Sequence, residues 1–115
     1  MQRTITMLAA GFVLALAPAA VSMADTSTTQ HLEHLMVENA DTPAEHQALA
    51  KYYRMKAADA KSLAEEHRAM GKQYGGKPGE VRRMAKHCDR IAELNDELAA
   101  QYESMAKGED AAAKQ

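Results

Sequence analysis

The sequence has few aromatic residues: four Tyr and one Phe make up 4% of its 115 residues, and Trp is absent. Its apolar residues are instead mostly helix formers such as Ala, Leu and Met, whereas strands favour aromatic and β-branched side chains. Only one Cys is present, which excludes an internal disulfide. The formal net charge is −2, so the basic excess typical of nucleic-acid binders is also missing. These absences predict one small all-α domain.

The first 24 residues have the layout of a cleaved signal peptide. A positive charge near the start is followed by the run Ile5–Ala17, which contains no charged residue. Ser22 and Ala24 then place small side chains at −3 and −1 before Asp25. The apolar run is shorter than the roughly 20 residues needed to span a bilayer, which favours cleavage over a retained anchor. We therefore expect export to a bacterial periplasm, with no membrane attachment after cleavage.

Residues 25–41 are predicted to contain a polar leader and a short amphipathic helix. Leu32, Leu35 and Met36 follow the i, i+3, i+4 spacing of one helical face. We expect this helix to run from about residue 30 to residue 39, because the chain before Pro43 is biased away from helical geometry.

Residues 42–107 are predicted to form a long antiparallel helical hairpin. Thr42 and Glu45 have the spacing of a capping box, and Pro43 suits the first position of a helix. The segment Gly75–Gly79 then reverses the chain, and so short a turn places the two helices antiparallel. A 3-4 spacing of mostly apolar residues predicts the interface. Its positions are His46, Leu49, Tyr53, Lys56, Ala60, Leu63, His67, Met70 and Tyr74, then Val81, Met84, Cys88, Ile91, Asn95, Leu98, Tyr102 and Met105.

A hairpin of two helices buries one face of each helix and leaves the remaining apolar surface in water. Two such hairpins complete a core by pairing into a four-helix bundle, which predicts a homodimer. The alternative is that the short first helix folds back onto the open end of the hairpin. Residues 108–115 are rich in Ala and charged side chains, and we expect them to form a frayed tail.

Near the predicted turn, the sequence gathers side chains that bind soft metals. If the chain reverses about Lys77, one His and one Met of each helix pair across the hairpin, and the single Cys lies beside them. The candidate metal ligands are His67, Met70, Met84, His87 and Cys88. Sulfur ligands suit Cu(I) and imidazole suits copper or zinc, whereas hard cations need carboxylates. Copper is therefore the expected cofactor, with zinc or no metal as the alternatives.

Other functions fit parts of the same pattern. Met also fills irregular helical cores and adaptable binding faces, so a second hypothesis is a chaperone-like or partner-binding hairpin without metal. A third is non-covalent haem held between His and Met. Cys88 is a ligand, a buried thiol or one half of a dimer disulfide, and the sequence leaves these open. We expect no enzyme, because neither a phosphate-binding loop nor a complete catalytic constellation is evident.

The stretches Glu45–Tyr53 and Met84–Cys88 resemble small exported helical-hairpin proteins of proteobacteria, a group without an assigned function. The resemblance covers most of the chain that follows the predicted signal peptide. It implies export and a helical hairpin, and it implies no activity. From the residues themselves, the sequence predicts a periplasmic metal-binding protein that acts as a copper carrier or buffer.

Overall fold

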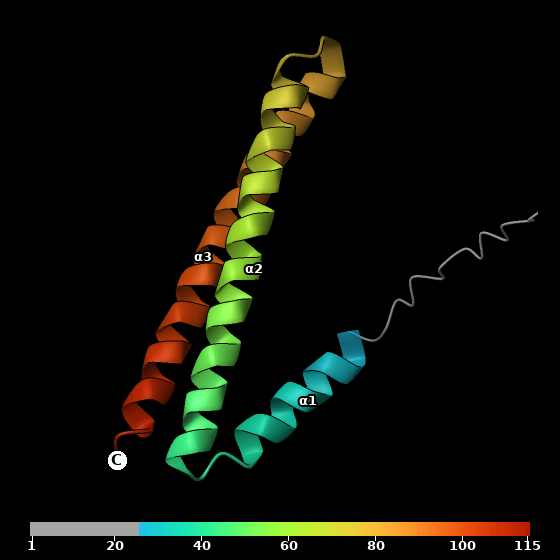
Figure 1. Ribbon diagram of the computed structural model, residues 1–115. Helices are drawn as coiled ribbons and strands as arrows, with labels where there is room; N and C mark the ends of the chain where they lie inside the picture. The colour runs from blue at the N-terminus through green and yellow to red at the C-terminus, as the bar shows by residue number, and fades with distance from the viewer. Residues whose placement is uncertain (1–25) are drawn as a thin grey trace, which may run out of the picture.

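The protein is a long helical hairpin with a shorter helix at its open end. The computed structural model describes residues 26–115, and the predicted signal peptide lies outside this range. The elements are α1 (Thr26–Glu38), α2 (Pro43–Gly75), the 3-10 helix η1 (Gly79–Arg83) and α3 (Met84–Ala112). α2 and α3 lie side by side and antiparallel, and α1 leans away from them (Figure 1). The predicted all-α hairpin is confirmed for these residues, in which no helix is long and apolar enough to cross a membrane.

Three boundaries differ from those expected. α1 begins at Thr26, so the polar leader is already helical, and the 3-10 turn η1 was not foreseen. α3 continues past Gly108 to Ala112, whereas the sequence predicted fraying from residue 108. Contacts with α2 account for this extension, because Glu109 and Asp110 both pair with residues of α2.

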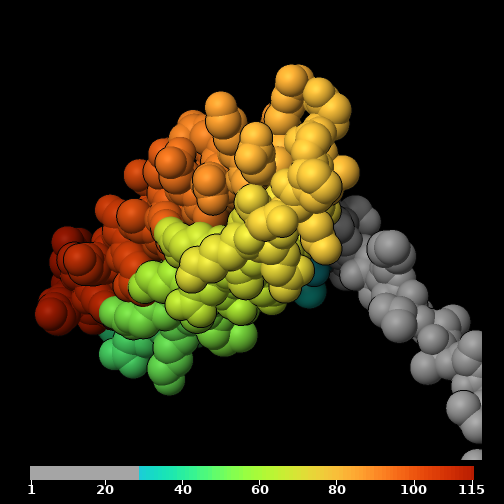
Figure 2. Space-filling view, turned by 90° about the horizontal axis from the view of Figure 1, so that it is seen from above, coloured from blue at the N-terminus to red at the C-terminus, as the bar shows by residue number. Residues whose placement is uncertain are grey.

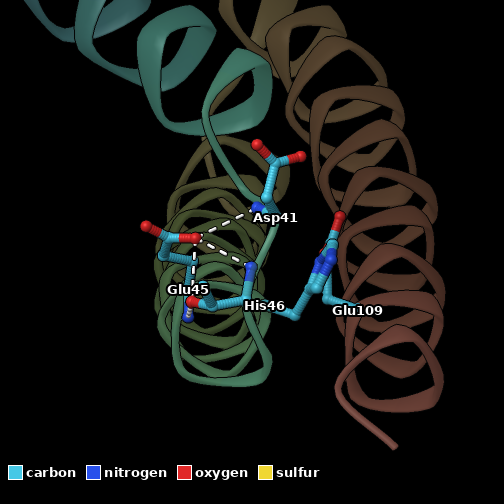
Figure 3. Close-up of polar contacts among 5 residues, drawn as sticks. Asp41, Glu45, His46 and Glu109 are labelled. Carbon is cyan, nitrogen blue, oxygen red and sulfur yellow. Dashed lines mark hydrogen bonds and ion pairs between the residues drawn. The ribbon is translucent and has the colours of Figure 1, made fainter. Parts of the chain in front are cut away.

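The start of α2 is held by the predicted capping box. The backbone N–H of Glu45 donates to Oγ1 of Thr42 at 3.3 Å, and Oε2 of Glu45 accepts from the backbone N–H of Thr42 at 2.8 Å. The same oxygen accepts from the N–H of Asp41 at 3.0 Å (Figure 3). Hydrogen bonds from Thr42 and then Asp41 hold the pKa of the Glu45 carboxyl below its usual value. These bonds satisfy backbone donors that a helix start otherwise leaves free.

The two long helices meet along rows of small residues spaced seven apart. On α2 the row is Ala50, Ala57, Ala64 and Gly71, and on α3 it is Ala92, Ala99 and Ala106, all of them buried. Small side chains let two helix backbones approach closely. At Gly71 a Cβ atom would lie 2.9 Å from Oδ1 of Asp89 and 3.5 Å from Cβ of Cys88. At Gly71, α3 therefore leaves little room for a larger residue on α2.

Most of the large apolar side chains expected at the centre of the interface lie at its edge instead. Leu49, Tyr53 and Cys88 are buried as predicted, but six others are 37–46% exposed. We call these six the apolar face: Leu63, Met70, Met84, Ile91, Leu98 and Met105. Each belongs to a heptad position one residue before the small-residue row of its helix, which rotates it about 100° away from the contact. The prediction followed the 3-4 spacing of mostly apolar residues, whereas close packing selected the small residues beside them.

The opposite edge of the hairpin is charged. Three ion pairs join the helices there: Arg54 with Asp110, Lys61 with Glu103, and Arg68 with Asp96. Each of these residues comes four positions after a small residue of the interface. The ion pairs therefore show that equivalent heptad positions of α2 and α3 lie on the same side of the plane that contains the two helix axes. By the same geometry, the residues of the apolar face, which share another heptad position, form one surface on the opposite side of that plane. Exposed pairs of this kind contribute about 0–1 kcal/mol each, so they help select the register more than they stabilise it.

At the open end, aromatic side chains fill the space between the helices. Leu49 and Tyr53 are almost fully buried there, and the ring of Tyr53 stacks on Tyr102 with centroids 6.2 Å apart. The Tyr52 hydroxyl donates to Glu33 of α1 at 2.9 Å. Burial, followed by this carboxylate, raises the pKa of Tyr52 to about 12. This hydrogen bond ties α1 to the same side of α2 that carries Leu49.

Candidate functional site

A row of side chains along the hairpin sets the register of the two long helices. Near the open end, Nδ1 of His46 lies 2.7 Å from Oε2 of Glu109 (Figure 3). Seven residues further along α2 and seven back along α3, Tyr53 stacks on Tyr102. One heptad forward on α2 therefore matches one heptad back on α3.

Extended by two heptads towards the turn, the same row puts His67 of α2 level with Cys88 of α3. Cys88 is 6% exposed and His67 is half-buried. Nδ1 of His67 is buried and has no hydrogen-bond partner. A buried polar atom without a partner costs about 1–3 kcal/mol, so Nδ1 of His67 has an acceptor or donor site free for a further partner. The sequence paired His67 with His87, and extension of the row by whole heptads puts it level with the next residue of α3.

The two methionines of the predicted cluster flank this pair on the apolar face. Met70 follows His67 by three residues and Met84 precedes Cys88 by four, so each shares a side of its helix with the inner residue. Their side chains are 37% and 42% exposed. His87 is exposed and lies three residues after Met84, at the outer rim of the group. Burial therefore differs within the group: the imidazole of His67 and the thiol of Cys88 are the more buried side chains, and the two thioethers are more exposed.

The chemistry of this set depends on sulfur. In the part of the chain that the structure describes, no three His, Cys, Asp or Glu side chains are grouped to hold a metal ion. His67 and Cys88 supply two such donors, and any further inner ligand is a thioether from Met70 or Met84. Structural zinc sites are usually completed by Cys, His or carboxylates, whereas thioethers favour Cu(I). The residues present therefore fit a soft monovalent ion better than they fit Zn²⁺.

The sequence analysis missed a second feature, an apolar groove between α1 and α2. It encloses about 340 Å³ and is lined by Leu32, Leu35, Met36, Asn39, Glu45, Ala48 and Leu49. We call it the α1–α2 groove. The spacing of the three large apolar residues of α1 signalled that this face would be covered, but the sequence gave no angle between α1 and the hairpin. α1 leans away from the hairpin (Figure 1), and the groove lies between α1 and the start of α2.

Two other histidines have carboxylate partners. His34 pairs with Glu38 within α1 at 3.1 Å, and His46 pairs with Glu109. They are therefore weaker candidates for metal ligands than His67.

Comparison with known proteins leaves the site to be interpreted from its own residues: no protein-family model, curated protein or solved structure matches the chain.

Proposed function

We propose that this protein binds Cu(I) in the turn half of the hairpin, as a carrier or buffer. The observation that carries the proposal is the buried, unpartnered Nδ1 of His67, in the same row as the buried Cys88. In this proposal His67 and Cys88 are the inner ligands, and Met70 and Met84 supply thioether sulfur. His87 is the outermost candidate and the first to meet an incoming ion.

The donor set explains why copper is favoured. A Cys thiolate balances the single charge of Cu(I), so the bound pair is neutral and tolerates the half-buried position of the site. Thioether sulfur is soft and uncharged, which suits Cu(I) and gives little affinity for Mg²⁺ or Ca²⁺. In the single chain, Met70 and Met84 are 37% and 42% exposed, so both sulfur atoms lie near the surface of the hairpin.

A competition titration tests this proposal. The reduced protein is titrated with Cu(I) against a colorimetric chelator, and separately with Zn(II). We expect Cys88→Ser to weaken Cu(I) binding about tenfold or more and Zn(II) binding less, because the soft donor selects copper. His67→Ala should weaken both metals. His34→Ala, which removes an exposed imidazole paired with Glu38, is the control and should change neither. Failure of Cu(I) to compete with the chelator would overturn the proposal.

We also propose that the protein acts in the periplasm after removal of residues 1–24. The support is the charged start, apolar run and small residues before Asp25. Amino-terminal sequencing of the protein recovered from a periplasmic fraction should begin at Asp25. Recovery of the intact chain with the membrane fraction would contradict both the cleavage and the compartment.

A second proposal is that two hairpins pair into a four-helix bundle. It is supported by the apolar face, whose six large side chains are each about two-fifths exposed on one side of the helix layer. Contiguous apolar surface of this kind marks an interaction site in a soluble protein. Light scattering should give twice the monomer mass. Leu98→Glu, at the middle of the face, should give the monomer mass, and Gln101→Glu, an exposed position beside it, should leave the dimer intact.

A further inference from the structure

Charge is divided unequally between the two ends of the hairpin. The turn half, residues 68–90, contains seven basic side chains against two acidic ones. The basic residues are Arg68, Lys72, Lys77, Arg82, Arg83, Lys86 and Arg90. The open end, residues 29–54 and 103–115, contains seven acidic side chains against four basic ones. The acidic residues are Glu33, Glu38, Asp41, Glu45, Glu103, Glu109 and Asp110. Three of these charges have partners just outside the two ranges: Arg68 pairs with Asp96, Arg90 with Glu93 and Glu97, and Glu103 with Lys61. Without these three, the turn half still has five basic side chains against two acidic ones and the open end six acidic against four basic, so one end is positive and the other negative.

Both ends of the hairpin also carry apolar surface: exposed side chains at the turn and a groove at the open end. The turn presents Val81, which is 50% exposed, and Met84, which is 42% exposed. The open end presents the α1–α2 groove, whose apolar lining includes Leu35 and Leu49. The groove adjoins the apolar face, because α1 is tied to the side of α2 that carries Leu49. Figure 2, seen from the turn end, shows α2 and α3 side by side.

We propose that the second copy packs on the apolar face in the opposite orientation, with its turn in the α1–α2 groove of the first. The proposal rests on the pairing of two hairpins proposed above and specifies its geometry. A twofold axis perpendicular to the long axis of the rod relates the two copies. Each basic turn then lies against the acidic open end of the other copy, and the contact is made twice.

The area available is consistent with this arrangement. The largest apolar patch that a typical soluble monomer exposes measures about 300–600 Å². A standard interface needs about 800 Å² from each partner, so a patch of that size alone falls short. Filling the α1–α2 groove with the partner's turn supplies the additional area. The groove is left empty in an arrangement that covers the face alone.

The competing arrangement has both turns at the same end. It places two basic turns beside each other and two acidic open ends beside each other, which is unfavourable for both contacts. It also places the two α1 helices at one end of the dimer. Charge therefore distinguishes the two orientations, although the apolar face could serve in either.

Cysteine cross-linking tests the orientation. In a Cys88→Ser background, one protein carries Leu35→Cys in the groove and another carries Val81→Cys at the turn. The two are mixed, allowed to exchange subunits and treated with a short bismaleimide. We expect a covalent dimer in the mixture and none with either protein alone. Self-linking of the Val81→Cys protein would show both turns at one end and would overturn the inference.

Light scattering on the same samples separates this inference from the pairing on which it depends. Monomers in the Cys88→Ser background would overturn both. Dimers that form no mixed cross-link would overturn the orientation and leave the four-helix pairing in place. Salt gives an independent measure: the dimer dissociation constant should rise roughly threefold or more on going from low to high salt, because screening weakens attraction between opposite ends. A dissociation constant that falls with salt would indicate like charges in contact.

Discussion

His46 and Glu109 are 63 residues apart in the sequence, yet their side chains meet at 2.7 Å. The contact joins the first turn of α2 to the end of α3, and both side chains are only 23% exposed. It therefore holds α2 and α3 together at the open end of the hairpin, the end away from the turn that connects them. Extended by three heptads towards the turn, the row that begins with this pair reaches His67 on α2 and Cys88 on α3.

Replacing His46 by Ala should lower the free energy of unfolding by about 1 kcal/mol, because a half-buried carboxylate loses its partner. Urea denaturation measures the change. His34→Ala is the matched control, since His34 is 68% exposed and pairs only within its own helix. An equal effect of the two substitutions would mean that the contact with Glu109 contributes nothing specific.

Enlarging a residue of the small-residue row should force the helices apart. Ala57 is fully buried, so Ala57→Leu should cost about 1–3 kcal/mol through overpacking. For a domain of this size, each 1 kcal/mol lowers Tm by about 4–8 °C. Ala58→Leu, at the exposed next position, should leave Tm nearly unchanged. Comparable melting of both variants would contradict close packing at this level.

Strong base should loosen α1. The pKa of Tyr52 is raised from its usual 10 to about 12, so the neutral phenol is favoured in the folded state. Its stabilising contribution is complete below pH 10 and is lost as the pH rises through about 12. Ultraviolet titration of phenolate should show a late transition that is absent from Tyr52→Phe. Glu33→Gln should lower this pKa only in part, because burial is the larger cause.

Cu(I) should protect the thiol of Cys88 from alkylation and raise Tm. The thiolate that reacts with alkylating reagents is also the metal ligand, and binding to the folded state stabilises it by mass action. Alkylation followed by mass spectrometry measures the protection. Unchanged alkylation and melting after Cu(I) addition would leave a structural thiol as the explanation.

The two roles proposed for Met70 and Met84 can be separated by Leu. The double variant Met70→Leu with Met84→Leu keeps the apolar volume and removes both sulfur atoms. Cu(I) affinity should fall while the dimer dissociation constant stays close to that of the unchanged protein. Loss of dimerisation with unchanged copper affinity would reverse these assignments.

The start of α2, the turn and the antiparallel hairpin could be predicted because each has a local signal. Thr42 and Glu45 cap the helix whatever lies around them, and Gly75–Gly79 reverses the chain. The face of each helix at the interface was less predictable. Leu63 and Ala64 are neighbours in the sequence, and only the distance between the helices decides which is buried.

The membership of the candidate site stays a prediction from residue types near the turn. Its pairing is harder to predict, because a shift of one residue, as between His87 and Cys88, is small along a rod but rotates a side chain by about 100°. The α1–α2 groove could not be foreseen, because it depends on the angle at which α1 leaves the hairpin. No local pattern encodes that angle. The hydrogen bond between Tyr52 and Glu33 helps set it.

Because the small residues recur every seven positions on both long helices, the contact between α2 and α3 repeats with each heptad. Removing one heptad from each helix would shorten the hairpin by about 10 Å and leave each remaining small residue facing the same kind of residue. The number of heptads therefore sets the distance between the turn and the open end, and this distance can change by whole heptads while the contact between α2 and α3 keeps its form.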